Sequence, residues 1–271
     1  MSNTVARPEH LPDFHAPPLH EVVLGVQFSS PKEYQQIFAR DVWDLFRTDY
    51  SQVQEHFPLP PSFETFGLPQ RPLVQQINFA PGASHDRFWF LRPDGEELLQ
   101  FQQDRLLHNW RKVGDRTNAY PRFESMIARF NEELNKLQNY LATLAPQTLL
   151  INQCEISYIN QIYMREDSVP SDWLRVVNFG DKCPDDFSMT FREVIRDESN
   201  KPQGRLTCEA SSAYLPSGQK IIQLTLTVRG APQAEGIVSA LDFLTAGREI
   251  IVQRFTGLTT EMAHKEWGRT K

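Results

Sequence analysis

The fold is indicated first by Glu-Val-Val-Leu-Gly-Val-Gln-Phe at residues 21–28, because a related segment, Glu-Ile-Ser-Tyr-Ile-Asn-Gln-Ile, recurs at residues 155–162. A glutamate leads both segments, and a glutamine occupies the seventh position of both. In the first segment apolar side chains alternate with the others, which is typical of a half-buried strand. Internal repetition of this kind predicts a duplicated architecture.

Two further matches support a duplication. Pro-Asp-Gly-Glu-Glu-Leu-Leu-Gln at residues 93–100 resembles Pro-Ser-Gly-Gln-Lys-Ile-Ile-Gln at 216–223, which suggests equivalent turns. A stripe of apolar residues at helical spacing within 120–144 recurs within 234–256. The shift between the stripes is a constant 114 residues, with Arg248 in place of the apolar Leu134. Identities are few, so the agreement in element order and helix phase carries more weight than the identities.

Each half is predicted to have the order β-α-β-β-β-α. In the first half we expect a strand at 21–28, a helix at 32–55, strands near 73–79, 86–92 and 96–112, and a helix at 120–144. In the second half we expect a strand at 149–164, a helix at 171–179 capped by Ser171, strands at 186–196, 204–215 and 219–230, and a helix at 234–256. The class is α+β, with one or two antiparallel sheets and the long helices packed on one face.

Four parts of the chain are predicted. Residues 1–18 are expected to be a flexible N-terminal arm, because they are rich in proline and histidine. The first half would span 19–146 and the second half 147–258. Residues 259–271 would form a tail helix capped by Thr259 or Thr260.

Composition narrows the class of protein. The chain has 271 residues, with the balance of charged and apolar residues of a soluble globular protein. The formal charge of −6 disfavours broad, non-specific binding of nucleic acid. The three cysteines are an odd number without close pairing, and no segment reads as a signal peptide or a membrane span. We therefore expect a cytoplasmic protein without a membrane partner.

The sequence lacks several recurrent motifs of catalysis. It contains no phosphate-binding glycine loop, no dinucleotide fingerprint and no nucleophile elbow. No pair of cysteines or histidines has the spacing of metal ligands. We therefore predict no catalytic residue, metal or cofactor, and whether the protein is an enzyme stays open.

Four segments carry a family resemblance. They are Pro-Pro-Leu leading into the strand at 21–28, Asn-Trp-Arg-Lys at 109–112 followed by Tyr-Pro-Arg-Phe-Glu at 120–124, the strand at 155–162, and His-Lys-Glu-Trp-Gly-Arg at 264–269. Together they resemble a sporadically distributed, functionally uncharacterised bacterial family of about this length. The resemblance implies a bacterial protein and no particular activity. Patchy distribution is common among mobile genes, including defence and toxin–antitoxin modules.

The first candidate binding residues are Asn109, Trp110 and Arg111, which end a long predicted strand. Tryptophan offers a broad ring and arginine a planar five-donor fork, a combination suited to recognition. The alternative is structural, with Trp110 at the sheet edge and Arg111 paired to an acidic neighbour such as Asp115.

The second group is Glu155, Tyr158 and Asn160, polar residues in what should be a central strand. A buried amide must be hydrogen-bonded. A satisfied polar network between the halves and a binding site on the open sheet face are both compatible with the pattern. Glu21 and Glu155 could also form a carboxylate pair across the seam, although solvated or salt-bridged glutamates are the simpler expectation.

The third group is Trp267 and Arg269, near a terminus where polar, mobile residues are usual. Trp267 either docks onto the body of the protein or contacts a partner, and the sequence does not choose between these.

The function predicted first is that of a non-catalytic binding or regulatory protein whose partner is another protein encoded nearby. The resemblance suggests that it belongs to a bacterial defence or toxin–antitoxin-like module. The alternative is an enzyme or sensor acting on a small phosphorylated or nucleotide ligand at the seam between the halves. Nucleic-acid binding on the open sheet face is a third option, which the net charge disfavours.

Overall fold

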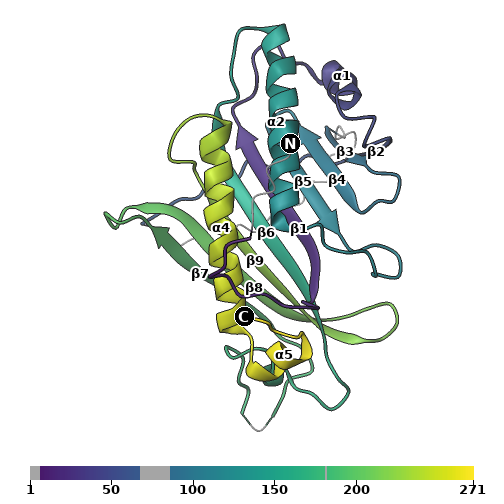
Figure 1. Ribbon diagram of the computed structural model, residues 1–271, viewed down its shortest axis with the longest axis vertical. Helices are drawn as coiled ribbons and strands as arrows, with labels where there is room; N and C mark the ends of the chain where they lie inside the picture. The colour runs from purple at the N-terminus through teal and green to yellow at the C-terminus, as the bar shows by residue number, and fades with distance from the viewer. Residues whose placement is uncertain (1–6, 68–85, 181) are drawn as a thin grey trace.

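Nine antiparallel strands form one sheet in the computed structural model, which describes residues 7–67, 86–180 and 182–271 (Figure 1). The strand order is β2-β3-β4-β5-β1-β6-β9-β8-β7, so the sheet joins the two predicted halves at the β1–β6 pair. We call this pair the seam. The strands are β1 (Leu19–Phe28), β2 (Gln52–His56), β3 (Arg87–Leu91), β4 (Glu97–Gln102), β5 (Arg105–Arg111), β6 (Ile151–Tyr163), β7 (Ser188–Arg196), β8 (Pro202–Tyr214) and β9 (Lys220–Gly230).

Two long helices, α2 (Phe123–Leu144) and α4 (Ile237–Leu258), lie side by side across one face of this sheet (Figure 1). Their predicted apolar stripes supply the buried positions, among them Phe130 and Leu137 in α2 and Leu244 and Ile251 in α4. The class and the packing of the long helices on one face are as predicted. Among the described residues, no helix is both long and apolar enough to cross a membrane.

α4 approaches the seam closely at Gly247. A Cβ atom at this position would lie 2.7 Å from Cγ2 of Ile156, so a larger residue would push the helix off β6. The next residue, Arg248, is 1% exposed and its guanidinium donates to Oε1 of Glu124 at 2.7 Å. The arginine that interrupts the apolar stripe therefore ties α4 to the first turn of α2.

The prediction of one strand over residues 96–112 is wrong. The segment forms a hairpin of β4 and β5, and the two residues Gln103 and Asp104 make the turn. The turns at 93–95 and 216–218 are consequently not equivalent: the first joins β3 to β4, whereas the second joins β8 to β9. In strand order, β8–β9 corresponds to β4–β5. That match therefore does not support the duplication, which stays a prediction.

The shorter helices also differ from the expectations. Residues 32–55 hold a 3₁₀ turn, η1 (Gln36–Phe38), a short helix, α1 (Ala39–Asp44), and β2. α3 (Pro170–Trp173) begins at a proline after Val169, and Ser171 lies inside it. α5 (Glu261–Glu266) is capped by Thr260 as proposed, because Thr260 accepts a hydrogen bond from the backbone of Ala263. The strand predicted at 73–79 lies outside the described residues.

The N-terminal segment contacts the C-terminal tail. Residues 7–18 were expected to be a flexible arm, yet Leu11 is fully buried and Phe14 is 7% exposed. The backbone N–H groups of His15 and Ala16 donate to the carbonyls of Gly268 and Trp267, each at 3.0 Å. The N-terminal segment is therefore held by the C-terminal tail.

A segment at 57–66, which we call the strap, crosses the face of the sheet opposite the long helices. Leu59 and Gln102 exchange two hydrogen bonds, of 2.8 and 3.0 Å, between the backbone and the side-chain amide. At the far end of the strap, Arg205 donates to the Glu64 carboxylate at 2.7 Å. This face is therefore partly covered, which weakens the expectation of an open platform for nucleic acid.

Candidate functional site

Asn109 belongs to a chain of hydrogen-bonded side chains on the strap side of the sheet. It receives a hydrogen bond from Nε2 of Gln100 at 3.0 Å and donates to Oε1 of Glu21 at 2.6 Å. Burial raises the pKa of Glu21, although Asn109 and the charge of Arg111 oppose the shift. Asn109 is 2% exposed, so it stabilises the sheet and is not available to a partner.

Trp110 and Arg111 point to opposite sides, because successive residues of a strand alternate faces. Trp110 is 1% exposed on the helix side, with its ring centroid 5.0 Å from that of Tyr120. Arg111 donates to the carbonyl of Gly95 at 3.1 Å and lies over the ring of Trp89. The three residues of the predicted recognition motif therefore do not form one surface.

Glu155 does not pair with Glu21. In the β1–β6 register Glu21 lies opposite Ile159 and Glu155 opposite Gly25, so four residues, roughly 13 Å of strand, separate the carboxylates. Glu155 instead accepts hydrogen bonds from Arg229. The expected alternative of a salt-bridged glutamate is the arrangement found.

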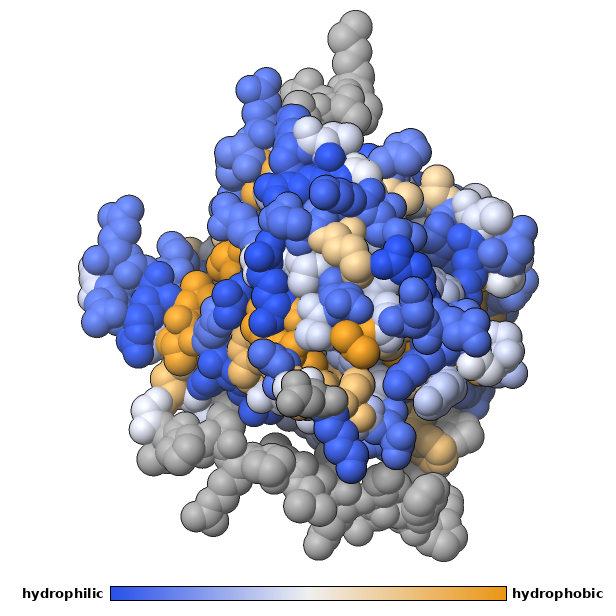
Figure 2. All heavy atoms as spheres, turned by 90° about the horizontal axis from the view of Figure 1, so that it is seen from below, coloured by the Kyte–Doolittle hydropathy of each residue, from blue (hydrophilic) through white to orange (hydrophobic). Residues whose placement is uncertain are grey.

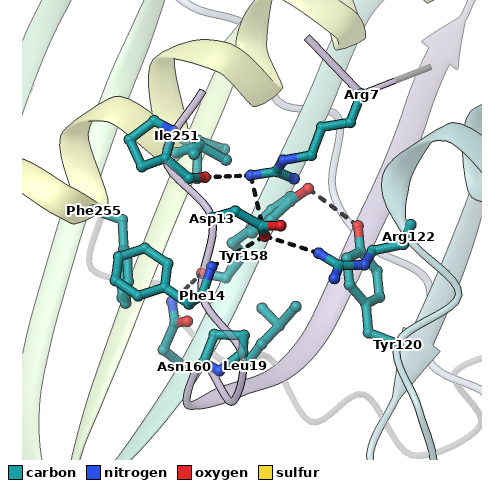
Figure 3. Close-up of a pocket in the computed structure, with 13 residues that line it drawn as sticks. Arg7, Asp13, Phe14, Leu19, Tyr120, Arg122, Tyr158, Asn160, Ile251 and Phe255 are labelled. Atoms are coloured by element: carbon teal, nitrogen blue, oxygen red, sulfur yellow. Dashed lines mark hydrogen bonds and ion pairs between the residues drawn. The ribbon is translucent and has the colours of Figure 1, made fainter. Parts of the chain in front are cut away.

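Tyr158 and Asn160 line a cavity between β6, α4 and the N-terminal segment, which we call the tyrosine cavity (Figure 3). The hydroxyls of Tyr158 and Tyr120 are 3.1 Å apart, and burial raises the pKa of both phenols. Asn160 donates to the carbonyl of Leu224 at 3.1 Å. These polar groups have partners, as expected for a network at the seam.

Charged residues close the mouth of the tyrosine cavity. Asp13 accepts a hydrogen bond from Arg122 at 3.0 Å and lies 3.6 Å from the guanidinium of Arg7 (Figure 3). Burial raises the pKa of Asp13, but the bond from Arg122 and the charge of Arg7 outweigh it, and the net shift is downward. The cavity measures about 60 Å³, room for only a few waters, so we do not assign a ligand to it.

Trp267 docks into the body of the protein, one of the two expected roles. It is 6% exposed, and its ring packs against Phe255, Trp173 and Phe14 at centroid distances of 5.4, 6.1 and 6.2 Å. Arg269 is exposed beside it and contacts Nδ1 of His264 at 3.3 Å. The tail residues therefore hold the N-terminal segment in place.

A second and larger hollow lies on the other side of residues 16–19, where β1 begins and β5 and β6 end. Its volume is about 370 Å³, within the usual range for small-molecule sites. We call it the basin. The residues that line it include His20, Lys112, Arg116, Gln161, Tyr163 and Trp267.

Two cations of the basin have neutral partners. Nζ of Lys112 donates to the carbonyl of Asn118 at 2.6 Å, and Arg116 donates to Oε1 of Gln161 at 3.0 Å and to the hydroxyl of Tyr163. Neither forms an ion pair with a carboxylate in the described part of the chain. The one acidic residue on the described rim, Glu266, lies 3.7 Å from Arg165. The basin therefore concentrates positive charge on a protein whose formal charge is −6.

The positive charge of the basin affects the pKa of His20. Burial lowers its pKa, and the positive charges of Arg116, Arg111 and Lys112 lower it further. An imidazole placed in this way is neutral near pH 7, and an anion bound beside it would favour its protonated form.

Aromatic and proline residues form the remaining walls of the basin. Trp173 and Trp267 line it as largely buried rings, whereas Tyr163 is 45% exposed. Pro17 and Pro18 supply rigid apolar surface on the N-terminal segment. Figure 2 shows this end of the molecule, where hydrophilic surface surrounds smaller apolar areas.

Of the residues nominated from the sequence, only Trp267 lines the basin. Lys112 stood within the Asn-Trp-Arg-Lys motif but was not selected, and His20, Arg116, Gln161 and Tyr163 were missed. The available signal was positional: His20 opens the first strand, and Lys112 and Arg116 follow the end of another. Polar residues at the ends of neighbouring strands can form one site. The sequence alone does not show that these strands are neighbours.

Comparisons with known proteins found no similarity to this chain: no family model, no curated protein and no solved structure matches it. The family resemblance drawn from the four motifs stays a prediction. Within the residues that the structure describes, no group of three or more His, Cys, Asp or Glu side chains could hold a metal ion.

The position of His20 predicts that anion affinity rises as the pH falls. Without an anion, its lowered pKa means that the stability contributed by neutral His20 is present above its usual pKa of 6.5 and is lost as the pH falls through the lowered value. A bound anion favours the protonated form, so binding takes up a proton. Titration with sulfate, whose own charge is constant between about pH 5 and 8, measures this directly. His20→Gln should flatten the profile, and a flat wild-type profile would exclude His20 from the site.

Proposed function

We propose that this protein is a non-catalytic binding protein that captures an anionic small molecule in the basin. Of the ligand classes expected from the sequence, a partner protein, a small phosphorylated molecule and nucleic acid, the hollow and its cations favour the small phosphorylated molecule. The observation that carries the proposal is that, among the residues the structure describes, Lys112 and Arg116 pair with neutral groups and form no ion pair with a carboxylate, in a hollow large enough for a ligand. Cations held in this way keep their charge available to an incoming anion.

The basin also joins parts of the chain that a regulatory protein would need to couple. Its walls come from the N-terminal segment, from the ends of β5 and β6 and from the C-terminal tail. A ligand that contacts all of these segments stabilises their docked arrangement, because binding to the folded form alone raises the free energy of unfolding. Membership in a bacterial defence or toxin–antitoxin-like module is a further part of the proposal, and this part rests on the family resemblance alone.

Internal duplication is a separate part of the proposal. It is supported by the strand order, in which β1 and β6 are central neighbours flanked by β5 and β9, then β4 and β8, then β3 and β7. It is also supported by the long helix that follows β5 in one half and β9 in the other. If the halves derive from one ancestor, the basin belongs to the features in which they differ.

The proposal predicts measurable binding of inorganic pyrophosphate, a compact multivalent anion. Isothermal titration should give saturable binding to the wild-type protein, and pyrophosphate at 100 times its Kd should add about 2.7 kcal/mol to stability. Lys112→Gln and Arg116→Gln should each weaken binding about tenfold or more, because each removes a charge-assisted hydrogen bond.

Lys136→Gln is the matched control, because Lys136 is an exposed lysine on α2, outside the basin. It should leave the affinity unchanged. Equal weakening by all three substitutions would mean that pyrophosphate responds to net charge only, and absence of binding to the wild-type protein would refute the proposal.

A further inference from the structure

We infer that the ligand of the basin is a nucleotide, that is, a phosphate ester that carries an aromatic base. This inference rests on the proposed function, since it names the ligand class of the same site. It comes from the walls of the basin, whereas the proposed function comes from its cations.

The cations of the basin suit phosphate oxygens. Arg116 offers planar guanidinium donors, Lys112 a compact ammonium and His20 an imidazole that can be protonated. Gln161 adds an amide that already holds Arg116 through its oxygen at 3.0 Å, which leaves its NH₂ group as a donor. Several donors of different geometry in one hollow match an anion with several oxygens.

A nucleotide also needs a flat apolar surface for its base, and Tyr163 provides one. Tyr163 is 45% exposed, unlike the buried tyrosines of the helix side, and the guanidinium of Arg116 lies 5.9 Å from the centroid of its ring. The hydroxyl accepts a hydrogen bond from Arg116, which holds the ring in place beside the cation. A base stacks well on an aromatic ring that is already oriented in this way.

The two requirements are met within one hollow of about 370 Å³, which accommodates a small ligand with both a polar and a flat apolar part. Pro17 and Pro18 also line the basin and add rigid apolar surface. A simple inorganic anion would leave this surface in contact with water, so the geometry points to a ligand with an aromatic group.

The test compares ADP, inorganic pyrophosphate and adenosine by isothermal titration to the 271-residue protein. We expect ADP to bind at least about tenfold more tightly than pyrophosphate, because stacking on an aromatic ring is worth about 1–3 kcal/mol per base. Adenosine should bind most weakly. Tyr163→Leu should reduce ADP affinity about tenfold more than it reduces pyrophosphate affinity, whereas Tyr163→Phe, which keeps the ring, should retain most ADP affinity.

The outcomes separate the two proposals. Equal affinities for ADP and pyrophosphate, with no effect of Tyr163→Leu on either, would overturn the nucleotide inference and leave anion binding standing. Binding of neither compound would overturn both. If Tyr163→Leu weakened ADP and pyrophosphate alike, the ring would act only by positioning Arg116, and the inference would again fail.

Discussion

Replacement of Glu133 by alanine is expected to destabilise the protein by about 3–5 kcal/mol, because two buried side chains lose their hydrogen-bond partner and each such loss costs about 1–3 kcal/mol. Glu133 is 3% exposed on the sheet-facing side of α2. One carboxylate oxygen lies 2.8 Å from Nδ1 of the fully buried His108, and the other accepts a hydrogen bond from Tyr50 at 2.6 Å. Alanine would leave both partners buried without this carboxylate.

The phenol of Tyr50 remains a hydrogen-bond donor in this cluster, because burial and the neighbouring charge of Glu133 raise its pKa well above its usual value. Urea denaturation monitored by circular dichroism measures the loss of stability. Glu132→Ala is the matched control on the same helix, since Glu132 is exposed and its removal should change stability by less than about 0.5 kcal/mol. Similar midpoints for both variants would show that the buried cluster contributes little.

Replacement of Trp267 by alanine is expected to cost about 3–5 kcal/mol, as for other large aromatic residues removed from a core. The ring is 6% exposed and packs among Phe14, Trp173 and Phe255. Its loss also frees the N-terminal segment, because the carbonyl of Trp267 accepts from Ala16 only while the tail is docked. Limited proteolysis should therefore cut the variant first within residues 7–18.

Arg269→Ala is the control for Trp267, because Arg269 is exposed on the same tail. It should preserve both the stability and the protease resistance of the N-terminal segment. If Trp267→Ala retained wild-type stability and resistance, docking would not be its role, and the expectation of a partner contact would return.

The long elements could be predicted from the sequence because their patterns are regular. The stripes of α2 and α4 repeat every three or four residues, and the alternation in β1 and β9 leaves one face apolar. The β4–β5 turn was missed because Gln103-Asp104 contains neither glycine nor proline. A signal was nevertheless present: buried apolar residues of the helix side fall at odd positions up to Phe101 and at even positions from Leu106, as a two-residue turn requires.

The basin could not be predicted because its residues meet only through the sheet order. His20, Lys112 and Tyr163 lie far apart in the sequence and become neighbours because β1 pairs with both β5 and β6. The buried cluster of His108 and Glu133 was missed for a similar reason. Glu133 is adjacent to Leu134, which belongs to an apolar stripe in the sequence. Only the packing of α2 on β5 shows that Glu133 is buried on the same face, beside His108.

Direct localisation of an anion decides whether the basin is a binding site. Crystals soaked in selenate, an oxyanion located by its anomalous scattering, should show a peak between the side chains of Lys112 and Arg116, and this peak should disappear in Lys112→Gln crystals. A basin without selenate at concentrations well above the measured Kd of pyrophosphate, or selenate bound only at other positions, would contradict the proposed function.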